Sequence, residues 1–84
     1  MKSEGMVMIM DFETEVVKEK IRKILIECRQ EKGVTQTELG KVVGKSKTAV
    51  ASWEQGLSTP DATTLFHLAK YYDKTIDYMF GESK

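Results

Sequence analysis

The sequence contains very few of the residues that cross-link or interrupt a chain: one cysteine, one proline and one histidine among 84 residues. A single cysteine excludes an intramolecular disulfide, which fits a protein of the reducing cytoplasm. The lone His67 has no second histidine or cysteine at ligand spacing, and this argues against a metal site. No serine, cysteine or carboxylate has a catalytic companion. We therefore expect a cytoplasmic protein that is not an enzyme and has no cofactor.

Long hydrophobic runs are also missing. The apolar run at residues 6–10 has five residues, far fewer than the roughly 20 that span a bilayer, so we expect neither a membrane segment nor a signal peptide. Its alternating methionines leave two equal alternatives open, a short strand that pairs with a partner and a flexible segment, and Met10 could even be the natural start. We expect residues 1–12 to form a flexible or partner-binding extension and residues 82–84 a C-terminal tail.

An excess of charge of one sign is absent, because 13 basic residues balance 13 acidic ones. The balance is uneven along the chain. Residues 1–15 carry one basic and four acidic residues, whereas residues 16–56 carry nine basic and five acidic ones. The neutral total therefore hides a moderately basic centre. Nucleic-acid-binding domains usually carry a net positive charge, so nonspecific affinity for DNA should be weak and salt-dependent here.

The apolar residues recur at helical spacing, which predicts an all-α fold. Two stripes of this kind are Ile21, Ile24, Leu25 and Cys28, and further along Leu65, Leu68, Ala69 and Tyr72. Glycines and the single proline separate five predicted helices, at residues 13–31, 36–42, 47–54, 62–72 and 76–80. A chain of this length supports a single domain with a modest core, and we place that domain at residues 13–81.

The most informative segment is QTELGKVVGKSKTAVASWEQ, residues 36–55. Two short helices that cross steeply need a residue without bulk where their backbones approach, which suits Gly40, and often a glycine at the turn, which suits Gly44. Residues with capping side chains precede both helices: Thr35, paired with Glu38, and Ser46. The side chains expected in a shared core are Leu39, Val43, Val50 and Trp53. The segment predicts a helix-turn-helix, so sequence-specific reading of DNA is the leading hypothesis.

Four separated stretches carry a family resemblance: VTQTELG, SKTAVASWEQG, STPDATTLFHLAKYY and TIDYMFG. Through them the sequence resembles the phage repressor and Cro-like helix-turn-helix family, also called the xenobiotic-response-element family of regulators, over residues 21–81. The resemblance implies a compact five-helix lambda-repressor-like DNA-binding domain. It also implies a partly buried ion pair between Arg29 in the first helix and Glu54 at the end of the recognition helix.

The direction of side chains selects candidates for DNA binding. If Val50 and Trp53 face inward, the outward face of the second helix of the motif carries Lys47, Thr48 and Ser52. This face would enter the major groove with its N-terminal end nearest the bases. Lys47 can donate to guanine, while Thr48 offers a hydroxyl and a methyl group that suit thymine.

The resemblance implies further contacts with the phosphate backbone. Gln36 and Gln55 match family positions in two phosphate-binding regions. Ser46 and Lys45 complete the candidate set of DNA-binding residues. Lys45 departs from the family pattern, in which an apolar residue commonly follows the turn glycine. A phosphate contact and a simply solvated side chain are therefore equal alternatives for Lys45.

Together these features predict a transcriptional regulator of the phage or mobile-element repressor type. It would bind a palindromic operator in double-stranded DNA as a homodimer, because half-sites lie about one helical turn, roughly 34 Å, apart. No small-molecule effector is evident from the sequence. Two alternatives stay open: a protein-interaction module of the same fold without DNA binding, and a restriction-modification controller or antitoxin regulator.

Overall fold

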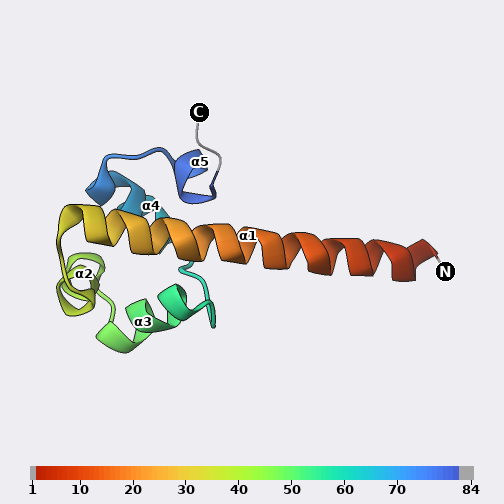
Figure 1. Cartoon of the computed structure of the whole chain (residues 1–84), viewed down its shortest axis with the longest axis horizontal. Helices are drawn as coiled ribbons and strands as arrows, with labels where there is room; N and C mark the ends of the chain where they lie inside the picture. Colours follow the sequence, from red (N-terminus) through yellow and green to blue (C-terminus); the bar gives the residue numbers. More distant parts are fainter. Residues whose placement is uncertain (1, 82–84) are drawn as a thin grey trace.

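A computed structural model describes the backbone of residues 2–81 and the side chains of residues 14–81. The described chain consists of five helices: α1 (Lys2–Lys32), α2 (Gln36–Val43), α3 (Lys47–Gln55), α4 (Ala62–Tyr72) and α5 (Ile76–Met79). In the view of Figure 1, α2 and α3 lie on one side of α1, and α4 and α5 lie on the other. The expected all-α, five-helix architecture is confirmed.

The boundaries of the last four helices agree with prediction to within one residue, whereas α1 is longer. The helix predicted to begin at residue 13 begins at Lys2. Its first half contains no proline, the residue that would interrupt a helix most strongly. The expectation of a flexible or partner-binding extension at residues 1–12 falls outside the residues whose side chains are described. The expected tail at residues 82–84 also lies outside the described part of the chain.

Short polar side chains fix where α2 to α5 begin. Each of these helices is preceded by a residue whose side-chain oxygen accepts a hydrogen bond from the backbone N–H three residues later; the four are Thr35, Ser46, Asp61 and Thr75. Such caps satisfy N–H groups that have no partner within the helix, and each typically stabilises by about 1 kcal/mol. The sequence therefore encodes the starts of four helices locally.

All five helices contribute to one core. The most deeply buried large side chains come one from each helix: Leu25, Leu39, Val50, Leu68 and Met79. Both predicted apolar stripes lie in this core, with Ile24 at its edge. Of the four residues expected in the core of the helix-turn-helix, Leu39, Val50 and Trp53 are buried and Val43 is half-buried. Because every helix supplies a central side chain, the domain should unfold as one unit.

Candidate nucleic-acid interface

The turn between α2 and α3 depends on two glycines. A Cβ atom on Gly40 would lie 2.5 Å from the carbonyl oxygen of Lys45, closer than van der Waals contact permits. The same two residues are joined by a hydrogen bond of 2.7 Å from the Lys45 N–H to the Gly40 carbonyl. Gly44 has φ +71°, in the left-handed region. The roles predicted for both glycines are confirmed.

Local hydrogen bonds fix where the two helices begin. Thr35 and Glu38 form the predicted capping box: the Glu38 N–H donates to the Thr35 hydroxyl at 3.0 Å, and the Thr35 N–H donates to the Glu38 carboxylate at 2.9 Å. Ser46 caps α3 by accepting from the Ala49 N–H at 3.0 Å. The start of α3, which the sequence analysis places nearest the bases, is thereby fixed by its own first turn.

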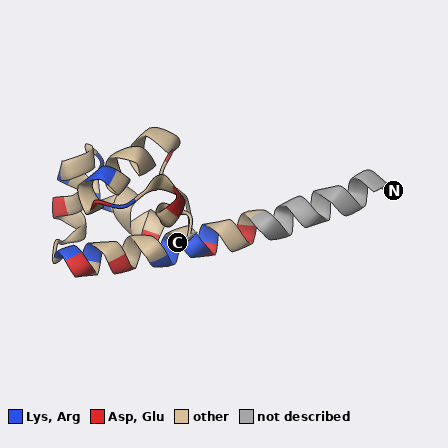
Figure 2. Ribbon diagram, turned by 90° about the horizontal axis from the view of Figure 1, so that it is seen from above, with Lys and Arg blue, Asp and Glu red and all other residues tan. Residues whose placement is uncertain are grey.

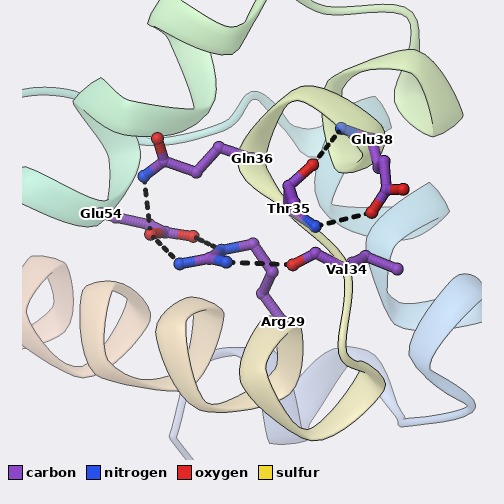
Figure 3. A network of polar contacts seen from close by, with 6 residues as sticks. All are labelled: Arg29, Val34, Thr35, Gln36, Glu38 and Glu54. Atoms are coloured by element: carbon purple, nitrogen blue, oxygen red, sulfur yellow. Dashed lines mark hydrogen bonds and ion pairs between the residues drawn. The ribbon is translucent and has the colours of Figure 1, made fainter.

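A network of polar side chains joins α1, α2 and α3 (Figure 3). Arg29 Nε and Nη2 donate to the two carboxylate oxygens of Glu54, at 2.7 and 3.0 Å. Arg29 Nη1 donates to the Val34 carbonyl at 3.0 Å, and Gln36 Nε2 donates to Glu54 Oε1 at 3.0 Å. The side chains of Arg29 and Glu54 are 18% and 8% exposed. The predicted ion pair is confirmed, and it is bidentate.

The two faces of α3 differ in the way predicted from side-chain direction. Val50 and Trp53 are buried, whereas Lys47 and Thr48 are exposed. Ser52 is half-buried, and its hydroxyl forms a 2.7 Å hydrogen bond with the hydroxyl of Ser58. Lys47 and Thr48 are therefore free to meet a ligand, while Ser52 is oriented by a residue from the following loop.

The remaining candidate residues lie around α3. Lys45 and Ser46 are exposed immediately before the helix, and Gln55 is exposed at its last turn. Gln36 is half-buried, and its amide points to Glu54 (Figure 3). The structure thus brings Lys45, Ser46, Lys47 and Thr48 together at one end of α3. Gln36 is connected to this helix through Glu54, and Gln55 lies at its other end.

Two features of this region were not predicted from the sequence. One is the bond from Gln36 to Glu54, and the other is the contact between Ser52 and Ser58. Neither has a periodic signature, because a polar side chain can find its partner in a neighbouring element at any sequence distance. The turn after α3 was a usable signal for the second contact, since the left-handed Gly56 (φ +79°) reverses the chain there.

Basic and acidic residues interleave over the described part of α1 (Figure 2). Within residues 14–81, no cluster of three or more histidine, cysteine or carboxylate groups could hold a metal ion. Cys28 is buried in the core, and burial raises the pKa of its thiol, so it carries little of the thiolate that a reactive cysteine needs. No helix among the described residues combines the length and apolar character needed to cross a bilayer.

These features define a helix-turn-helix domain. The profile of a family described as helix-turn-helix matches residues 25–79, more than half of the chain, and the chain belongs to that family. The resemblance recognised in the sequence is confirmed. The domain is a helix-turn-helix module and not an enzyme, as the sequence analysis expected.

Two curated relatives come from Bacillus subtilis (strain 168). The chain is 33% identical over 60 residues to the uncharacterized HTH-type transcriptional regulator YqaE, a match covering 70% of this chain and 52% of YqaE. It is 31% identical over 62 residues to the HTH-type transcriptional regulator ImmR, covering 74% of this chain and 49% of ImmR. The chain spans about half the length of the curated relatives it matches.

A solved structure has the same fold. It is the P22 c2 repressor protein in complex with synthetic operator 9T, which aligns with a TM-score of 0.70 and 27% sequence identity. The alignment covers 75% of this chain and 96% of the P22 c2 chain. The compact lambda-repressor-like fold expected from the sequence is therefore confirmed.

Proposed function

We propose that this protein is a sequence-specific, double-stranded-DNA-binding transcriptional regulator that acts in the cytoplasm. The observation that carries the proposal is the division of α3 into two faces. Val50 and Trp53 hold one face in the core, while Lys47 and Thr48 at its start are exposed. An anchored helix with a polar outer face and a free N-terminal end suits the major groove.

The relatives support this proposal. YqaE and ImmR are both named transcriptional regulators, and the P22 c2 repressor was solved with operator DNA. Within the proposed complex, Lys47, Thr48 and Ser52 would face the bases. Gln36, Lys45, Ser46 and Gln55 would contact the phosphate backbone or flank it. We further propose that two copies bind a palindromic operator and repress transcription by occupying it, with half-sites about 34 Å apart.

The decisive experiment is selection of bound sequences from a random duplex pool, followed by affinity measurements on the selected duplex and on a scrambled one. Lys47→Ala should lower the affinity for the selected duplex by about 1–3 kcal/mol and lower the preference over the scrambled duplex. Lys70→Ala is a matched control, because it removes the same charge from an exposed position on α4. Lys70→Ala should leave the preference for the selected duplex over the scrambled duplex unchanged.

The outcomes separate the proposed function from its alternatives. Enrichment of a palindrome and loss of preference in Lys47→Ala support a dimeric, base-reading regulator. Enrichment of a site without symmetry would overturn the proposed binding as a dimer, while the proposed sequence-specific regulator would stand. Failure of the folded protein to bind any duplex at low salt would overturn DNA binding and favour a protein-interaction module.

A further inference from the structure

The segment that follows α3 lacks positive charge. No lysine or arginine occurs between Lys47 and Lys70. The loop between α3 and α4, residues 56–61, ends instead in the carboxylate of Asp61. Phosphate contacts supply much of the affinity of DNA-binding proteins, and they come largely from lysine and arginine. If Gln55 and this loop approach a phosphate, a cation must come from another element.

Helix α1 brings Arg22 to this loop. A Cβ atom on Gly56 would lie 3.2 Å from Cδ of Arg22. The aliphatic part of Arg22 therefore packs over the turn that directly follows Gln55. The Arg22 side chain is still 30% exposed. Figure 1 shows the segment after α3 passing beside the middle of α1, which agrees with this contact.

A second cation lies one helical turn earlier. Lys18 and Arg22 are four residues apart, so they share a face of α1. Lys18 lines an open hollow of about 520 Å³ together with Thr59 and Pro60 of the same loop. No ion-pair partner of Lys18 occurs in the part of the chain whose side chains are described. Two positively charged side chains of α1, Lys18 and Arg22, therefore lie beside the loop at residues 56–61, which has no lysine or arginine of its own.

The guanidinium of Arg22 is oriented by Glu19. Arg22 Nε donates to Glu19 Oε1 at 3.1 Å, and Arg22 Nη2 donates to Glu19 Oε2. The Glu19 side chain is 51% exposed, and such exposed pairs are held weakly. A guanidinium has five N–H donors, so this pair leaves several for another oxygen. Glu19 therefore competes weakly with an incoming anion for the charge of Arg22.

We propose that Arg22, with Lys18 beside it, binds a phosphate of double-stranded DNA next to Gly56. In this site α1 supplies the positive charge that the segment after α3 lacks. The inference rests on the proposed DNA binding and adds a contact from a helix outside the helix-turn-helix. It also predicts that α1 lies against the DNA backbone in the complex.

The test compares two substitutions in the full chain. Arg22→Met removes the charge and keeps an unbranched stem over Gly56. Lys23→Met is the matched control, since it removes the same charge from the next residue, whose side chain is 63% exposed and whose nitrogen is also near Glu19, at 3.9 Å. Dissociation constants are measured by fluorescence anisotropy on a labelled duplex of mixed sequence, from about 50 to about 200 mM salt.

We expect Arg22→Met to weaken binding about tenfold near 0.1 M salt and to reduce the slope of log K against log salt by about one. Lys23→Met should change the slope much less. Equal effects of the two substitutions would overturn the inference, because they would reflect net charge alone. In that result the unaltered protein still binds DNA, so the proposed function stands. Absence of binding by the unaltered protein would overturn both.

Glu19→Gln provides an independent measurement if Arg22→Met is too unstable to compare. It keeps the side-chain shape and removes the competing carboxylate. We expect tighter binding to the same duplex, with a salt slope at least as steep as that of the unaltered protein. Unchanged or weaker binding by folded Glu19→Gln would overturn the inference.

Discussion

Beside the turn between α2 and α3, the space available for a Cβ atom limits which residue the chain can carry at position 40. Gly40 faces the backbone oxygen of Lys45, which has little freedom to move because it lies in the turn itself. Gly44 has open space around it but needs a positive φ. The two glycines are thus required for different reasons, one for volume and the other for conformation.

These reasons predict different costs. Gly40→Ala should destabilise the domain by about 1–3 kcal/mol or more, because the added methyl group must push the turn apart. Gly44→Ala should cost about 1–2 kcal/mol, the penalty of the left-handed region for a residue with a Cβ atom. Urea unfolding of both variants measures the two values. A Gly40→Ala variant as stable as the unaltered protein would show that the turn can open without cost.

The sequence predicted residue roles well where one local rule decides them. The requirement for a small residue at 40, a glycine at 44 and caps at 35 and 46 follows from short-range geometry, and the structure has all of these features. It did not predict the bond from Gln36 to Glu54 or the packing of Arg22 over Gly56. Both depend on how helices far apart in sequence are placed, which periodicity alone does not specify.

At the scale of elements, helix starts were easier to predict than the length of α1. Asp61 begins α4 by accepting from the Thr64 N–H at 2.8 Å. Such a cap appears in the sequence as a polar residue before an apolar stripe. The sequence has no proline before residue 60, so no proline limits where α1 begins. The helix begins at Lys2 instead of residue 13, because the sequence constrains its N-terminal end only weakly.

The cap of α4 makes part of the stability depend on pH. The hydrogen bond from the Thr64 N–H lowers the pKa of Asp61 below its ordinary value of 3.8. A lowered folded-state pKa means that this contribution is complete above the ordinary value and is lost as the pH falls through the folded value. Asn caps helices about as well as Asp but does not titrate there.

Asp61→Asn should therefore remove this pH dependence while keeping the helix start. We expect the stability advantage of the unaltered protein over Asp61→Asn to shrink as the pH falls below about 4. The measurement is the free energy of unfolding in urea at neutral and acidic pH for both proteins. Parallel pH curves would contradict the assigned role of the Asp61 carboxylate.

At the scale of the whole molecule, the network around Glu54 holds three helices together. Arg29 belongs to α1, Gln36 to α2 and Glu54 to α3. A charge left without its partner in such a buried position is strongly unfavourable. The sequence indicated the pair through the family resemblance, but its bidentate geometry and the third member became visible only in the structure.

Arg29→Met should destabilise the domain by about 3–5 kcal/mol, because the Glu54 carboxylate would remain buried without its cation. The double variant Arg29→Met/Glu54→Gln should be more stable than Arg29→Met alone, since the stranded charge is gone. Thermal and urea unfolding of the single and double variants provide the comparison. If the double variant were the less stable of the two, the ion pair would not be the cause of the loss.

The division of α3 into an anchored and an exposed face also makes the domain a scaffold for engineering. Val50, Trp53 and Glu54 tie the helix to the rest of the molecule, whereas Lys47 and Thr48 carry none of the core. Under the proposed function, a library randomised at the exposed positions would vary the preferred DNA sequence while leaving folding intact. Variants that each prefer a different DNA sequence could then be selected from one parent without redesigning its core.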